Sequence, residues 1–190
     1  IVNAANEHLA NAAGVAKAIE DAAGKEFIKE CQNSVSIYGP LKVGEARACT
    51  GGDLKCKVII NAVGPRWSSY RDKTECLAVL RDTVKSCLEL SNGSTHETIA
   101  LPSISAGIFG VPLPLCAEEY CQAIISFSKE TMTDLMYLKE VHFVDIKQDT
   151  LDVIQSTFSK WLKSSSGIRS FYITPFSSDK ETSSLQSKIQ

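Results

Sequence analysis

The sequence lacks the features that mark membrane proteins, nucleic-acid-binding proteins and zinc proteins. Its longest apolar runs fall far short of the roughly 20 residues that span a bilayer, and no signal-peptide pattern opens the chain. Its 20 basic side chains are outnumbered by 22 acidic ones, so no basic excess is available to neutralise nucleic-acid phosphates. The three histidines are scattered without metal-ligand spacing. We therefore expect no membrane, nucleic-acid or metal partner.

The composition favours one folded domain with reduced thiols. The chain has 190 residues and a hydrophobic fraction of 44%, enough for a sizeable core. Its seven cysteines are odd in number and include no C-x-x-C pair. In a domain of this size, that pattern is typical of mostly buried thiols in cytosolic or nuclear proteins. We expect a nuclear or cytoplasmic location.

Strand-like and helix-like segments alternate along the chain, which predicts an α/β fold with a largely parallel sheet covered on both faces. Strand-like apolar runs cover residues 1–4, 45–49, 57–63, 98–101 and 141–146, and helical periodicity covers residues 15–22, 27–35, 77–88, 116–127 and 151–162. After Lys163 the composition changes, because nine of the last 27 residues are serine. We expect a domain over residues 1–163 and a serine-rich linker or tail over residues 164–190.

The loop over residues 103–112 has the composition of a phosphate-binding loop. It runs from a predicted strand into a predicted helix, the position at which open α/β sheets bind ligands. Gly107 and Gly110 would let backbone N–H groups approach a ligand, and the N-terminus of the following helix would favour an anion. The loop matches neither the G-x-G-x-x-G nor the Walker A pattern. A tight turn without a ligand remains the alternative.

A second loop in an equivalent position, over residues 3–15, contains Asn6. The amide of Asn6 offers both a donor and an acceptor, as recognition of ribose hydroxyl groups requires. Asparagine is also a common turn-stabilising residue, so both interpretations stay open.

Four motifs in order resemble those of a macrodomain. They are Ile-Val-Asn-Ala-Ala-Asn at 1–6, Gly-Val-Ala at 14–16, Ala-Val-Gly-Pro-Arg-Trp at 62–67 and Ser-Ala-Gly-Ile-Phe-Gly at 105–110. The resemblance covers residues 1–163 and implies a three-layer α/β/α fold with a mixed, largely parallel central sheet. Residues 64–67 and 138–142 are most similar to the macrodomains of poly(ADP-ribose) polymerase family proteins that carry several macrodomains in tandem.

The resemblance implies a module that binds ADP-ribose as a ligand, free or attached to a protein, without a cofactor or catalytic residue. Asn6 would hydrogen-bond the distal ribose, and Phe109 would lie beside it. The other implied ligand-binding residues are Gly14, Val15, Ser105, Ala106, Gly107, Ile108 and Gly110. The strand and carboxylate that usually hold the adenine would precede Ile1, so we expect the chain to be a fragment of a longer protein. Arg66 and Trp67 are expected to be structural.

The chain departs from the macrodomain pattern in its first loop. Where ligand-binding members have a run of glycines, residues 11–14 read Asn-Ala-Ala-Gly, and an alanine Cβ can clash with a ligand or be strained at positive φ. Hydrolytic members have an aspartate where this chain has Ala16, or a histidine where it has Asn11. Three hypotheses follow: a module that binds ADP-ribosylated proteins, an ADP-ribosyl hydrolase with a substrate-assisted route, and a protein-interaction scaffold that has lost its ligand.

Overall fold

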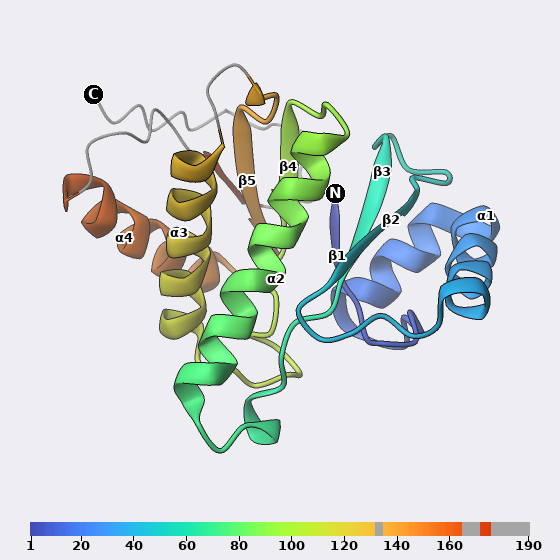
Figure 1. Cartoon of the computed structure of the whole chain (residues 1–190), viewed down its shortest axis with the longest axis horizontal. Helices are drawn as coiled ribbons and strands as arrows, with labels where there is room; N and C mark the ends of the chain where they lie inside the picture. Colours follow the sequence, from blue (N-terminus) through green and yellow to red (C-terminus); the bar gives the residue numbers. More distant parts are fainter. Residues whose placement is uncertain (132–134, 165–171, 176–190) are drawn as a thin grey trace.

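The computed structural model describes residues 1–131, 135–164 and 172–175 (Figure 1). The strands are β1 (Val2–Ala4), β2 (Ala46–Thr50), β3 (Val58–Ala62), β4 (Thr98–Leu101), β5 (Glu140–Asp145) and β6 (Tyr172–Pro175). The helices are α1 (Gly14–Tyr38), α2 (Lys73–Gly93), α3 (Leu113–Glu130) and α4 (Gln148–Ser164), with a 3₁₀ turn at Trp67–Ser69. The predicted alternation of strands and helices is confirmed.

The strands form two three-stranded sheets whose inner strands, β1 and β4, lie next to each other (Figure 1). In the order β1-β3-β2, β3 is parallel to β1 and antiparallel to β2. In the order β4-β5-β6, all neighbours are parallel. The mixed, largely parallel arrangement is confirmed. Strand β6 was not predicted, and it lies in the segment 164–190 that we expect to be a linker or tail; the rest of that segment beyond Ser164 lies outside the described residues.

Strand β3 and the residue after it show why both faces of the sheet are covered. Ile60 and Ala62 belong to the core cluster that includes α2 and α3, whereas Ile59 and Val63 belong to a second cluster. Phe27 of α1 lies in that second cluster. Because successive residues of a strand point to opposite faces, this division places helices on both sides of the sheet and confirms the three-layer architecture.

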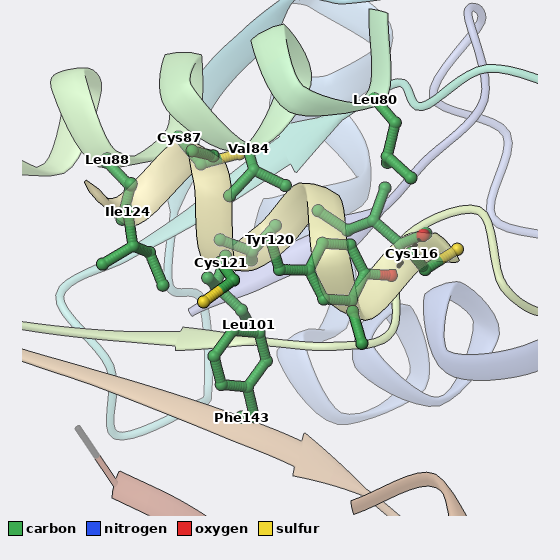
Figure 2. Packing of buried hydrophobic residues seen from close by; sticks show 14 of the residues in the cluster. Leu80, Val84, Cys87, Leu88, Leu101, Cys116, Tyr120, Cys121, Ile124 and Phe143 are labelled. Carbon is green, nitrogen blue, oxygen red and sulfur yellow. Dashed lines mark hydrogen bonds between the residues drawn. The ribbon is translucent and has the colours of Figure 1, made fainter. Parts of the chain in front are cut away.

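The larger core is centred on three aromatic rings. The ring of Phe143 in β5 stacks on Tyr120 of α3 with 5.7 Å between centroids (Figure 2). It also contacts the ring of Phe158 in α4, with 5.2 Å between centroids. All seven cysteines are free and six are buried, as predicted. Burial raises the pKa of Cys87 and Cys121 to about 12, so these groups remain neutral thiols at physiological pH.

Helix α1 consists of two helical segments that meet at Gly24, in agreement with the two predicted stretches. Gly24 has φ 76° and ψ −167°, a conformation that favours glycine. The second segment ends at Gly39, whose N–H donates to the carbonyl of Val35, and Pro40 follows. No helix within the described ranges combines the length and the apolar character needed to cross a membrane.

Tyr120 connects this core to the loop that follows β4. Its hydroxyl, fully buried, donates to the carbonyl oxygen of Ile104 at 2.5 Å. We expect Tyr120→Phe to lower the free energy of unfolding by about 1–2 kcal/mol, because the buried carbonyl loses its partner. Urea denaturation checks this, with Tyr137→Phe as the control, since Tyr137 is 47% exposed. Equal stability of the two variants would contradict the anchoring role.

Candidate functional site

The two loops singled out in the sequence lie together and enclose a cavity of about 160 Å³. We call it the loop cavity. Loop 1, residues 5–13, follows β1, and loop 2, residues 102–112, follows β4, so both leave the carboxyl ends of parallel strands. The lining comes from the strand ends (4, 5, 62 and 64), from the junction of loop 1 with α1 (13–16) and from loop 2 (103–105 and 107–109).

The first turn of α1 presents unused backbone donors to the loop cavity. The residue before the helix is Ala13, whose methyl group cannot accept a hydrogen bond from the first turn. The first turn also contains no acidic residue. The N–H groups of Gly14, Val15 and Ala16 have no acceptor among the described residues. Such a helix start attracts an anion. The sequence led us to expect this role for the helix after loop 2, but residues of α3 do not line the cavity.

Loop 2 presents a second set of unused donors. Its own bonds, Val111 N–H to Ser105 O and Gly110 N–H to Gly107 O, are both 3.0 Å long and fix its shape. The N–H groups of Gly107, Ile108 and Phe109 have no acceptor in the described part of the chain. Two sets of residues with free N–H groups therefore line one small cavity, and this arrangement suits a group with several anionic oxygens.

Ser105 brings a buried hydroxyl group to the loop cavity. The residue has φ 65° and is 6% exposed, and its Oγ has no hydrogen-bond partner among the described residues. Gly64 packs directly against it: a Cβ on Gly64 would collide with this Oγ and would lie 2.7 Å from Cγ2 of Ile104. Ser105 thus places a buried hydroxyl group without a partner in the wall of the loop cavity.

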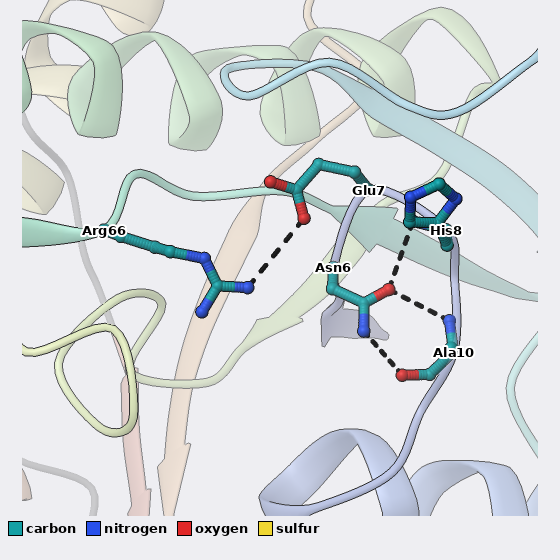
Figure 3. A network of polar contacts seen from close by, with 5 residues as sticks. All are labelled: Asn6, Glu7, His8, Ala10 and Arg66. Carbon is teal, nitrogen blue, oxygen red and sulfur yellow. Dashed lines mark hydrogen bonds and ion pairs between the residues drawn. The ribbon is translucent and has the colours of Figure 1, made fainter. Parts of the chain in front are cut away.

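Asn6 is the predicted ligand-binding residue whose placement differs most from the expectation. Its Oδ1 accepts from the N–H groups of His8 at 3.1 Å and Ala10 at 3.0 Å, and its Nδ2 donates to the carbonyl of Ala10 at 2.7 Å (Figure 3). Asn6 does not line the loop cavity. The geometry matches the alternative interpretation, in which Asn6 stabilises the turn of loop 1.

The other predicted residues divide into two groups. Those that line the cavity are Gly14, Val15, Ser105, Gly107, Ile108 and Phe109. Ala106 and Gly110 do not line it. Gly110 has φ 74°, so it is required by the backbone of loop 2. Ile108 is 75% exposed and stands opposite Gly14, where a Cβ would lie 3.9 Å from its Cδ1. The side chain of Ile108 therefore covers part of the gap between the loops.

A buried chain of asparagines anchors loop 1, and sequence reasoning missed it. Asn3 Nδ2 donates to Oδ1 of Asn11 at 3.0 Å and to Oδ1 of Asn61 at 2.9 Å. Asn11 in turn donates to the carboxylate of Glu20 at 3.1 Å. Asn11 thus connects loop 1 to β1, β3 and α1. The only signal in the sequence was an asparagine in β1, in loop 1 and in β3.

Arg66 lies beside the loop cavity, in contact with the lining residue Phe109, and its expected structural role stays a prediction. Its guanidinium carbon is 3.9 Å from the centroid of the Phe109 ring, a cation–π arrangement. Its Nη2 is 3.9 Å from Oε2 of Glu7 (Figure 3). Both side chains of this ion pair are more than a third exposed, so solvent limits its contribution to about 0–1 kcal/mol.

The lining of the loop cavity contains no carboxylate, imidazole, thiol or amine side chain. Within the described ranges, no group of three His, Cys, Asp or Glu side chains could hold a metal ion. The lining offers backbone hydrogen-bond donors, two serine hydroxyl groups and apolar surface, and of the two hydroxyl groups that of Ser103 already donates to Asp145. This arrangement can bind an anion beside a sugar-sized group.

Comparison with known proteins shows the family to which the chain belongs. The family model described as the Macro domain matches residues 2–120. A macro domain-containing protein of Listeria monocytogenes is 36% identical over 155 residues, which are 80% of this chain and 84% of that protein. An O-acetyl-ADP-ribose deacetylase of an Enterobacter species is 32% identical over 155 residues, covering 82% of this chain and 83% of that protein. The chain belongs to the macro domain family.

Within this family, the relatives include both large and small proteins. Human protein mono-ADP-ribosyltransferase PARP14 is 38% identical over 155 residues, 80% of this chain but only 8% of that protein. The structure of the Oceanobacillus iheyensis macrodomain with ADP has a TM-score of 0.77 at 30% identity, covering 86% of this chain and 84% of that one. A Trypanosoma brucei macrodomain in complex with ADP-ribose, at 24% identity and a TM-score of 0.70, shares the fold and covers 82% of this chain and 61% of that one.

The unpartnered hydroxyl of Ser105 leads to a stability prediction. We expect Ser105→Ala to leave the free energy of unfolding unchanged or to raise it by about 1 kcal/mol, because a buried group without a partner is removed. Ser34→Ala is the matched control: Ser34 is also buried, but its Oγ accepts from Arg47 at 3.0 Å, so its loss should cost about 1 kcal/mol. Urea denaturation of both variants measures the difference. A clear loss of stability in Ser105→Ala would show that its hydroxyl already has a partner.

Proposed function

We propose that this domain binds ADP-ribose, free or as mono-ADP-ribosylation on proteins, with the diphosphate between α1 and loop 2. The donors of Gly14, Val15 and Ala16 would contact the diphosphate from one side, and those of Gly107 to Phe109 from the other. The hydroxyl of Ser105 would donate to a phosphate oxygen. The distal ribose would lie beside Phe109, as the resemblance implies. The nucleotide ligands of the macrodomain structures described above support the same chemistry.

The position of Gly107 is the main observation in support of this proposal. Its φ is ordinary, and a Cβ built on it would meet no heavy atom within 4 Å. The fold therefore does not require glycine at this position, unlike Gly64 or Gly110. Gly107 lines the loop cavity, so the space beside it is available to a ligand.

The alanines of loop 1 are compatible with ligand binding. Neither Ala12 nor Ala13 has a positive φ, and Ala13 has the extended values φ −155° and ψ 166°. The expected backbone strain is therefore absent at both positions, which weakens the case for a scaffold that has lost its ligand. The volume of about 160 Å³ is below the roughly 300 Å³ of typical small-molecule pockets, so only part of ADP-ribose would be enclosed.

Binding without hydrolysis is the activity that the lining favours. A hydrolase needs a group that activates water, and the lining provides no side chain able to accept a proton at neutral pH. Ala16 lines the cavity where hydrolytic members of the family have a carboxylate. The named activity of the Enterobacter relative keeps hydrolysis as the alternative to test.

The likeness to human PARP14 supports a place for this domain in a multidomain ADP-ribosyltransferase-family protein. The free, mostly buried thiols are typical of proteins of the nucleus or cytoplasm. In that setting, ADP-ribosylated proteins would be its partners. The Listeria protein is similar to this chain at nearly the same identity, and the matched region makes up 84% of its length. This likeness supports the same binding function for a macro domain that forms most of a small protein.

Calorimetric titration of ADP-ribose tests the proposed function, with ADP and AMP as comparison ligands. We expect micromolar binding to the wild type. Gly107→Val should weaken it by about 10- to 100-fold, equivalent to the roughly 1–3 kcal/mol that overpacking costs. Its melting temperature should not change, because the new side chain enters open space. Gly93→Val is the control, since a Cβ there also meets nothing within 4 Å, at the end of α2 away from the cavity. Unchanged affinity in Gly107→Val would refute this position for the ligand.

A second experiment separates binding from hydrolysis. A mono-ADP-ribosylated protein is incubated with a molar excess of the domain for several hours, and released ADP-ribose is measured. We expect no release by the wild type, and release by Ala16→Asp, because that change puts a carboxylate in the cavity lining. Release by the wild type would establish the hydrolase hypothesis instead.

A further inference from the structure

The guanidinium of Arg66 has unused hydrogen-bond donors at the rim of the loop cavity. It is fixed against the ring of Phe109, with 3.9 Å between the guanidinium carbon and the ring centroid. Its N–H groups donate to no acceptor in the described part of the chain, and its side chain is 43% exposed. Contact with the ring holds the guanidinium at this place, while its N–H groups remain available to another group.

The charges around Arg66 leave room for a second anion. The carboxylate of Glu7 is its nearest charged group, but at 3.9 Å the contact is too long for a hydrogen bond. Residues 66–73 carry Arg66, Arg71 and Lys73 against one acidic residue, Asp72. The amine of Lys73 is engaged, since it donates to the carbonyls of Trp67 at 2.7 Å and Tyr70 at 2.6 Å. Among the basic residues of this segment, Arg66 is therefore the one that lies beside the cavity and has N–H groups available to bind an anion.

We infer that Arg66 binds the carboxylate of an acidic residue next to the modified residue of an ADP-ribosylated protein. This inference rests on the proposed function, which places the distal ribose, and hence the attached protein, beside Phe109. Because the guanidinium contacts the ring of Phe109, a protein attached to a ribose beside that ring would lie within its reach. A carboxylate fits two parallel N–H groups of an arginine, a geometry that the amide of glutamine does not match. Arg66 thus gives the site a preference for acidic target sequences.

Two synthetic peptides test this inference on the 190-residue chain. Both carry one mono-ADP-ribosylated serine, flanked on each side by glutamate in the first peptide and by glutamine in the second. We expect the wild type to bind the glutamate peptide about threefold to fivefold more tightly, as suits a charge pair at an exposed rim. The difference should shrink as salt is raised. Fluorescence anisotropy measures both affinities.

Four variants test whether Arg66 causes the preference for the glutamate peptide. Arg66→Gln should bind the two peptides equally, and Arg66→Lys should keep only part of the preference, because an ammonium lacks the planar fork. Arg71→Gln makes the same charge change on an exposed side chain of the same segment and should keep the full preference. Glu7→Gln should increase the preference, since it removes the competing carboxylate.

The outcomes separate this inference from the proposed function. If free ADP-ribose binds but the wild type treats both peptides alike, the role of Arg66 is refuted and the ADP-ribose site stands. Retention of the preference in Arg66→Gln, or its loss in Arg71→Gln, also refutes that role. If the wild type binds neither free ADP-ribose nor the peptides, the proposed function fails and the inference fails with it.

Discussion

The close approach of Gly64 to loop 2 is the constraint on which the site geometry depends. Gly64 follows β3, and the absence of a side chain there lets the Oγ of Ser105 and the Cγ2 of Ile104 pack directly against its backbone. Tyr120 holds the same loop from the core by its hydrogen bond to Ile104. The backbone of loop 2 is thereby fixed from two sides, and the N–H groups of Gly107, Ile108 and Phe109, which line the cavity, are left without an acceptor in the described part of the chain.

Hydrogen bonds from the surrounding structure hold both donor-bearing loops in place. The buried asparagines hold loop 1 as Tyr120 holds loop 2. The N–H of Trp67 donates to the carbonyl of Phe109 at 2.8 Å, which keeps the tip of loop 2 against the segment that carries Arg66. The supporting bonds come from β1, β3, α3 and the 3₁₀ turn, so the site is an assembly of distant segments.

The sequence was sufficient to predict most of the fold, because its signals are local. Apolar runs of strand length and helical periodicity identified β1 to β5 and all four helices, and the Gly24 kink separated two periodic stretches. Strand β6 was missed since four residues in a serine-rich segment give no periodic signal, and its strand character depends on pairing with β5. The position of loops 1 and 2 was predictable from the rule that parallel strands end at one edge.

The details of the site were less predictable, because they depend on contacts between segments far apart in the sequence. Whether Asn6 contacts a ligand or its own loop is decided by the path of residues 7–10, which no local pattern specifies. The stacking of Arg66 on Phe109 requires β3 and β4 to be placed first. The sequence analysis assigned an anion-binding helix start to α3 and also named Gly14 and Val15 of α1 as ligand-binding residues. Because α1 and α3 both begin after a strand, only the assembled fold shows which helix lines the cavity.

The loop cavity draws its polarity mainly from the main chain, and this has a consequence for how such a site changes over evolutionary time. Every residue type except proline carries the same N–H group, so substitutions that keep the backbone path preserve recognition. Affinity would then be lost through added bulk more often than through loss of a functional group. Two macro domains can therefore differ in many loop residues and still bind the same ligand. A single larger side chain in the cavity, in contrast, can abolish binding.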